Sequence, residues 1–88
     1  MKIFVVNQIS NVNGSMFYTS IPCATLQAAQ RVVMEIVNDL KKGHYKNLDI
    51  NGTNEYFAVD MEETAISIDD LYENHSERFY INEESLIQ

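Results

Sequence analysis

Residues 25–42 read TLQAAQRVVMEIVNDLKK, and this stretch carries the strongest structural pattern in the chain. Its apolar side chains recur at every third or fourth position, at Leu26, Ala29, Val33, Ile36, Val37 and Leu40. That spacing collects them on one face of a helix, with polar side chains on the other. The stretch therefore predicts one amphipathic helix whose wide apolar stripe is better matched to a sheet than to a partner helix.

Both ends of this stretch carry residues that begin or end helices. Thr25 can accept a hydrogen bond from a free amide of the first turn. Lys41 and Lys42 complement the negative end of the helix dipole. Gly43 follows and can adopt the left-handed conformation that closes a helix. The sequence therefore predicts that the helix occupies residues 25–42.

Two strands are predicted before the helix. Residues 2–10 contain the apolar run 3–6, which is typical of a strand buried on both faces. Asn13-Gly14 is a strong signal for a tight hairpin turn. Residues 15–21 then return as a second strand, which Pro22 is expected to end because proline cannot donate to a ladder.

Three strands are predicted after the helix, over residues 55–61, 64–68 and 78–84. The polar stretch 44–54 forms either a small hairpin closed by Asn51-Gly52 or a plain loop. Residues 69–77 form a polar connection, with a helical turn over residues 69–72 as one option. The order β-β-α-β-β-β predicts an α+β fold, an antiparallel sheet of four or five strands with one amphipathic helix packed on one face.

Length and composition limit the kind of protein. Eighty-eight residues are expected to form a single domain over 1–88. Cys23 is the one cysteine, and the two histidines are far apart in sequence, so no zinc site, cofactor or catalytic residue is expected. The first apolar run is too short for a secretion signal or a membrane span, which makes a cytoplasmic protein the default expectation.

The charge of the chain is divided unevenly. The net charge is −7, made up of +3 for residues 1–46 and −10 for residues 47–88. An acidic half repels nucleic-acid phosphates and anionic membranes, so neither is expected as a direct partner. It is compatible with binding to a basic protein surface or to cations.

The ending TAISIDD (64–70), a short acidic turn and then RFYINEESL (78–86), resembles the C-terminal hairpin of small acidic proteins of phage and mobile-element genomes. The beginning, MKIFVV (1–6) with a hairpin that leads into an alanine-rich helix, is similar to the same group. The resemblance implies no common activity and no site residues. It implies small accessory proteins, some of which act by binding host machinery.

Cys23 is a candidate nucleophile, with His44 or His75 as its base. No motif surrounds it, and a small apolar residue between a strand and a helix is the favoured interpretation.

Asp49, Asn51, Thr53 and Asp60 match part of the ligand spacing of a calcium loop. Asn54 stands where the sharp turn of such a loop needs glycine, and no helices flank it. A polar turn is therefore favoured.

Two pairs of adjacent acids, Glu62-Glu63 and Asp69-Asp70, are candidates for binding a divalent cation or for acid–base catalysis. Neighbouring residues on a strand point to opposite faces, however, so the two carboxylates of a pair do not converge. Acids beside a strand also prevent aggregation through sheet edges, which is the favoured interpretation.

The acidic half also contains tyrosines, which are enriched at binding hot spots. Together they predict one anionic surface that binds a partner, whereas the alternative is that the acids only keep the protein soluble. The predicted surface consists of Tyr56, Asp60, Glu62, Glu63, Asp69, Asp70, Tyr72, Glu73, Tyr80 and Glu83.

The leading hypothesis is a non-enzymatic interaction module that docks on a basic, nucleic-acid-handling host protein, in the manner of an anti-CRISPR inhibitor. The alternatives are a small ligand- or metal-binding protein, a minor enzyme, or a homodimer whose sheet edges pair.

Overall fold

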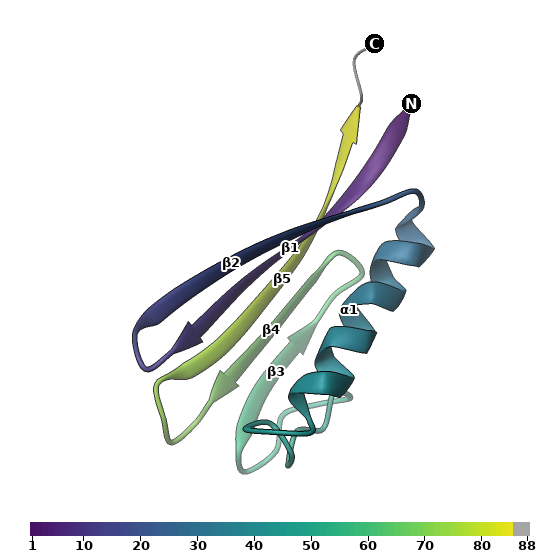
Figure 1. Cartoon of the computed structure of the whole chain (residues 1–88). Helices are drawn as coiled ribbons and strands as arrows, with labels where there is room; N and C mark the ends of the chain where they lie inside the picture. Colours follow the sequence, from purple (N-terminus) through teal and green to yellow (C-terminus); the bar gives the residue numbers. More distant parts are fainter. Residues whose placement is uncertain (86–88) are drawn as a thin grey trace.

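Residues 1–85, which the computed structural model describes, fold into one antiparallel sheet of five strands with a single helix on one face (Figure 1). The elements are β1 (Lys2–Val12), β2 (Ser15–Cys23), α1 (Leu26–Leu40), β3 (Phe57–Met61), β4 (Ala65–Asp70) and β5 (His75–Ser85). The predicted α+β fold class and order of elements are confirmed. Residues 86–88 lie outside the described part.

The strands lie in the order β2-β1-β5-β4-β3, and each neighbouring pair is antiparallel. β1 therefore pairs with its neighbour in sequence, β2, and also with β5 from the far end of the chain (Figure 1). Val6 shows the register, because it lies opposite Ile21 on one side and Ile81 on the other. β2 and β3 form the two edges of the sheet.

Local signals for the first hairpin and the helix start are confirmed. Asn13 and Gly14 both have positive φ, 53° and 91°, as the two-residue hairpin turn between β1 and β2 requires. The Ala28 amide donates to Thr25 Oγ1 at 3.0 Å, so Thr25 is the N-cap. Within residues 1–85, no helix has both the length and the apolar composition needed to span a membrane.

The predicted end of the helix is wrong. α1 ends at Leu40, and Lys41 is a right-handed C-cap with φ −68°. Gly43 does not take a left-handed conformation; its amide donates to Leu40 O at 3.1 Å in a run of right-handed turns. These turns satisfy the last helical carbonyls without a glycine at positive φ.

The core lies between α1 and the sheet. Ala29, Val33 and Val37 contribute the buried face of the helix, as the periodicity predicts. Tyr45 and Leu48, which belong to the stretch 44–54, are also buried. That stretch is a loop, so the hairpin alternative is wrong, and Tyr45 and Leu48 join the hydrophobic core, with Ile50 packed against it. The other buried apolar residues are Val6, Phe57, Ile68 and Phe79.

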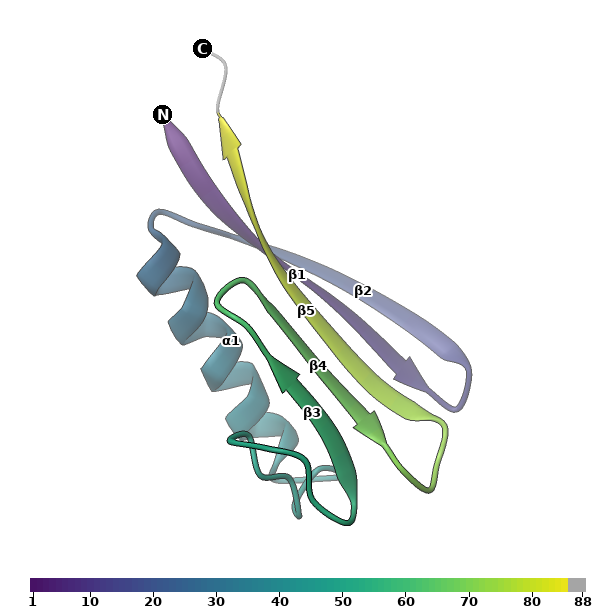
Figure 2. The ribbon, with the colours of Figure 1, turned by 180° about the vertical axis from the view of Figure 1, so that it is seen from behind.

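The opposite face of the sheet has no covering layer among the described residues, and Figure 2 shows it from that side. Val5 and Ile9 of β1 point to this face and are only half-buried. The prediction that residues 3–6 are buried on both faces is therefore wrong. On the outer face these side chains are shielded only by those of the neighbouring strands, and no second layer covers them among the described residues. This open face becomes a candidate for binding.

Pro22 does not end the second strand. β2 continues to Cys23, and Pro22 lies opposite Val5. The reason is that β2 is an edge strand, where a residue without an N–H is tolerated.

The helical turn predicted over residues 69–72 is also wrong. Asp69 and Asp70 complete β4, and β5 begins at His75. A tight turn replaces the helical one, because Asp70 Oδ1 accepts the amides of Tyr72 and Glu73 at 2.8 and 3.0 Å.

Candidate functional site

The ten residues predicted to form one partner surface are divided between opposite ends of β4. Asp60, Glu62, Glu63 and Tyr80 lie at the end where β3 turns into β4. At the end where β4 turns into β5 the structure places Tyr56, Asp70, Tyr72 and Glu73. The six residues of β4 separate the two groups by about 20 Å.

The last two predicted residues form ion pairs within the chain. Asp69 Oδ1 lies 2.8 Å from Arg78 Nη2 on the open face. Glu83 Oε1 lies 3.2 Å from Lys2 Nζ. These two carboxylates are therefore less available to a partner than exposed acids without a cation beside them.

At the β3–β4 end, acidic side chains border a shallow hollow of about 270 Å³. Asp60 and Glu62 line it together with Tyr80, which is 42% exposed, and with Arg78, whose guanidinium pairs with Asp69. Glu63 adds a third carboxylate in the same turn. None of these three acids forms an ion pair within residues 1–85. We call Asp60, Glu62, Glu63 and Tyr80 the acidic rim.

At the other end of β4, the structure brings the two histidines together. The rings of His44 and His75 stack with centroids 3.9 Å apart and planes 15° from parallel. His44 Nε2 lies 2.7 Å from Asp70 Oδ2. Glu73 Oε2 lies 3.7 Å from His44 Nε2 and 3.9 Å from His75 Nε2. We call these four residues the histidine cluster.

The expectation that the histidines lie too far apart to share a site is wrong. The loop after α1 carries His44 back across the sheet to the first residue of β5. Only the tertiary fold makes this contact, and no spacing in the sequence indicates it.

The carboxylate of Asp70 is held in one orientation. Burial alone would raise its pKa, but hydrogen bonds from the Tyr72 and Glu73 amides, together with His44, outweigh burial and lower the pKa. Oδ1 accepts the two amides, so Oδ2 is the oxygen that faces His44. Asp70 is therefore a fixed, ionised group beside the histidine ring.

Glu77 lies inside the core and is 1% exposed. Its carboxylate accepts hydrogen bonds from Ser10 Oγ at 2.6 Å, Gln8 Nε2 at 2.9 Å and the Tyr45 hydroxyl at 3.3 Å. Burial and the nearby Glu77 charge both raise the pKa of the Tyr45 phenol. The prediction that residues 69–77 form a polar connection is wrong for Glu77, which lies on β5 and points inward in the same alternation as Phe79 and Ile81.

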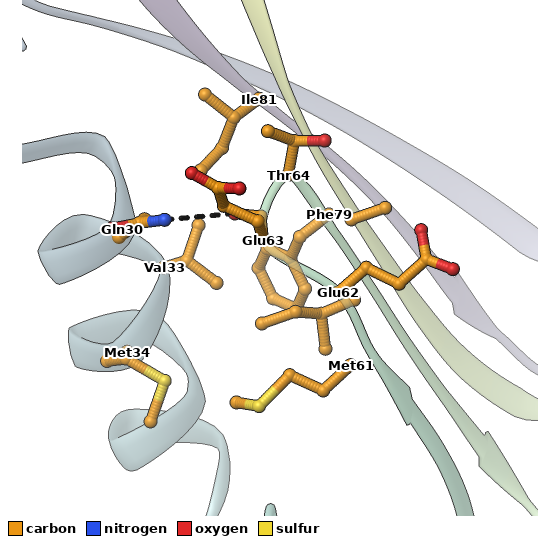
Figure 3. Close-up of a pocket in the computed structure, with 11 residues that line it drawn as sticks. Gln30, Val33, Met34, Met61, Glu62, Glu63, Thr64, Phe79 and Ile81 are labelled. Atoms are coloured by element: carbon orange, nitrogen blue, oxygen red, sulfur yellow. Dashed lines mark hydrogen bonds between the residues drawn. The ribbon is translucent and has the colours of Figure 1, made fainter. Parts of the chain in front are cut away.

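A largely apolar cavity of about 390 Å³ opens between α1 and the β3–β4 turn (Figure 3). Met34 on the helix and Met61 on β3 lie on its two sides, and Phe79 and Ile81 contribute to its wall. The Gln30 side-chain amide crosses it and donates to Glu63 O at 3.1 Å. The sequence pattern did not indicate this cavity.

Cys23 has no histidine beside it. It ends β2 at the start of α1, whereas His44 follows the end of the helix, whose 15 residues span about 22 Å. A Cys23–His44 nucleophile and base pair is therefore excluded by the fold, and His75 lies with His44.

The calcium-loop alternative is also not formed. Asp49 Oδ1 accepts the Asn51 amide at 2.9 Å and closes a polar turn. Thr53 Oγ1 accepts the Val59 amide at 3.0 Å, and Asp60 lies on the strand beyond. Asp69 and Asp70 diverge as predicted, since Asp69 binds Arg78 on one face and Asp70 contacts His44 on the other. Glu62 and Glu63 lie in the turn between β3 and β4 rather than on a strand, so the strand argument does not apply to them.

Three arrangements of side chains are therefore candidates for function. They are the acidic rim, the histidine cluster and the apolar cavity. No family model, curated protein or solved structure matches the chain, so a function has to be inferred from the contacts and charges of its own residues.

Proposed function

We propose that this protein is a non-enzymatic interaction module that binds a basic protein surface through its acidic rim. The observation that carries the proposal is that Asp60 and Glu62 line one hollow with the exposed Tyr80, that Glu63 lies in the adjoining turn, and that none of these three acids forms an ion pair within residues 1–85. Neighbouring carboxylates repel one another, and a bound cationic surface would relieve that repulsion. Tyr80 supplies the rigid aromatic contact that binding sites favour.

The position of the rim in the sheet supports docking. Asp60 lies on β3, an edge strand, and Tyr80 and the hollow open onto the uncovered face. A partner can therefore approach from the edge and from the open face without displacing α1. The net charge of −10 over residues 47–88 attracts a basic partner to this half of the chain in general.

The chemistry of the rim narrows the class of partner. Carboxylates spaced along a strand and a turn can occupy positions that phosphates take on a protein that binds nucleic acid. A basic, nucleic-acid-handling protein of a host cell is the proposed target, and inhibition of that protein is the proposed consequence. The resemblance to acidic accessory proteins of phage and mobile elements agrees with this choice.

Matched charge reversals test the proposal. The rim variant combines Asp60→Lys, Glu62→Lys and Glu63→Lys, and the control makes the same charge change at the exposed residues Glu35, Asp39 and Glu55, of which Asp39 pairs with Lys42 on the surface of α1. The target is first recovered from host lysate, then purified and titrated with each variant at low and moderate salt. We expect the rim variant to bind at least about tenfold more weakly at low salt, since each exposed ion pair contributes roughly 0.2–1 kcal/mol and reversal adds repulsion.

The control variant should bind as the wild type does, and wild-type affinity should fall as salt rises. Equal affinity of the rim variant and the wild type would show that the acids serve solubility alone.

The apolar cavity favours a second candidate function, the binding of a small apolar ligand. Its volume of about 390 Å³ falls in the range of known ligand sites. Methionine side chains such as Met34 and Met61 adapt to varied ligand shapes. Titration with a fluorescent apolar probe checks this function. The wild type should give a saturable signal, and Met34→Trp should abolish it by filling the cavity. An unchanged signal in that variant would exclude the cavity as the binding site of the probe.

A further inference from the structure

The histidine cluster gathers two imidazoles and two carboxylates at one end of the sheet. His44 comes from the loop after α1, Asp70 from the end of β4, Glu73 from the following turn, and His75 from the start of β5. Ligand atoms of His44, Glu73 and His75 all lie within 4.8 Å of one another. Asp70 Oδ2 is 2.7 Å from His44 Nε2 and so belongs to the same cluster. We propose that these four residues bind a divalent transition-metal ion, with zinc as the best fit.

The distances suit the size of a zinc ion. With Zn–N and Zn–O bonds of about 2.0–2.2 Å, the ligand atoms of a tetrahedral site lie roughly 3.3–3.6 Å apart. The three contacts in the cluster are 2.7, 3.7 and 3.9 Å, which lie on both sides of that range. The ligand atoms are therefore close enough to reach one ion, and the main rearrangement that a tetrahedral site still needs is a rotation of one histidine ring.

The ligand types select the metal. Imidazole nitrogen suits zinc and its transition-metal neighbours, whereas calcium and magnesium take oxygen ligands almost exclusively. Two histidines with two carboxylates form an N₂O₂ ligand set. Zinc accepts such a set because its filled d shell imposes no geometric preference. The ion takes the place of the hydrogen on Nε2 of each ring, and the neutral ring then carries its hydrogen on Nδ1.

The surroundings favour a cation. Asp70 is already oriented by the Tyr72 and Glu73 amides, which occupy its other oxygen. Two positions further along β5 lies Glu77, a core carboxylate that forms no ion pair within residues 1–85. An ion bound at His44 and His75 would bring positive charge close to these carboxylates. Hydrogen bonds that orient a ligand, such as those from the two amides to Asp70, increase the affinity of a metal site.

Ion binding must break the ring stack. The planes of His44 and His75 are only 15° from parallel, so their in-plane lone pairs cannot meet at one ion. His44 is the ring that turns, because its side chain is 34% exposed on a loop, compared with 14% for His75 on β5. Binding therefore leaves a spectroscopic signature, the loss of the mutual ring-current shifts of the two imidazoles.

The test uses the full chain without a histidine tag, in a Cys23→Ser background that removes the lone thiol as a zinc ligand. Calorimetric titration with ZnCl₂ should give one ion per chain with a Kd of about 10⁻⁶ M or tighter, and CaCl₂ and MgCl₂ should give no comparable binding. His75→Gln and Glu73→Gln should each weaken zinc binding by at least about tenfold, while Glu35→Gln, on the exposed side of α1, leaves it unchanged. In proton NMR, zinc should shift the ring protons of both histidines.

Two results would overturn the proposal. One is a zinc Kd weaker than about 10⁻⁴ M, the level of the weakest dedicated cation sites. The other is wild-type zinc affinity in the His75→Gln chain, with its fold checked by circular dichroism. The rim variant should still bind zinc normally, because the rim lies at the opposite end of β4. A negative result in the zinc titration therefore leaves the proposed partner binding standing, and the reverse also holds.

Discussion

Removing the buried carboxylate of Glu77 should destabilise the protein more than most single substitutions. Glu77→Ala breaks the hydrogen bonds to Ser10 at 2.6 Å and Gln8 at 2.9 Å, and the weaker one to Tyr45 at 3.3 Å. Bonds to a charged group are worth roughly 1.5–3 kcal/mol each, and the relieved cost of burying the charge offsets part of this. The expected loss is therefore about 2–4 kcal/mol in the free energy of unfolding.

That loss is large for a chain of this size. Eighty-eight residues at roughly 0.05–0.15 kcal/mol per residue give a total stability of about 4–13 kcal/mol. Urea denaturation followed by circular dichroism measures the change. With an m value near 1.5 kcal/mol/M, the midpoint should fall by about 1–3 M.

Partner substitutions provide an internal control. Ser10→Ala removes the shortest hydrogen bond to Glu77 and should cost more than Tyr45→Phe, which removes the longest. Glu77→Gln keeps the shape and one acceptor, so it should cost less than Glu77→Ala. A Glu77→Ala loss below about 1 kcal/mol would refute the reasoning, because it would mean that these hydrogen bonds do not hold β5 to β1 and to the loop.

Three further predictions concern single residues. Burial and the Glu77 charge raise the pKa of the Tyr45 phenol above its unfolded value of 10.0, so the free energy of unfolding should stay constant below about pH 10 and fall above it. Urea midpoints measured between about pH 8 and 11 check this, and Tyr45→Phe should flatten the fall. Gly14→Ala should lower the free energy of unfolding by roughly 1–3 kcal/mol, because φ is +91° at that position. Gly52 has open space around it and no positive φ, so Gly52→Ala should change the same quantity by no more than about 0.5 kcal/mol in the same assay. Thr25→Ala should lower the free energy of unfolding by about 1 kcal/mol through loss of the N-cap, and Thr25→Ser, which restores the acceptor, should recover most of it.

Elements with strong local signals could be predicted from the sequence. The helix over Leu26–Leu40, its cap at Thr25 and the turn at Asn13-Gly14 all depend on residues within a few positions of one another. Pro22 and Gly43 show where such rules fail. Pro22 is tolerated because β2 turned out to be an edge strand, and Gly43 is not needed as a left-handed cap because right-handed turns satisfy the helix end.

The candidate sites depended on contacts that the sequence does not encode locally. His44 and His75 are neighbours only because the loop after α1 returns to the β4–β5 turn. The acids counted together in the second half of the chain divide between two ends of β4, and Asp69 and Glu83 pair with Arg78 and Lys2. Charge composition predicted the sign of the surface but could not place the residues on it.

The central position of β1 has a consequence for the order in which this protein can fold. Gln8 on β1 bonds Glu77 on β5, 69 positions away in sequence. During synthesis at about 5–20 residues per second, the β1–β2 hairpin must wait roughly 3–10 seconds before β5 is made. Until then β1 has one open edge and α1 lacks most of the sheet that it covers. The native sheet therefore closes late, and its first hairpin is the segment most exposed to wrong pairing on the ribosome.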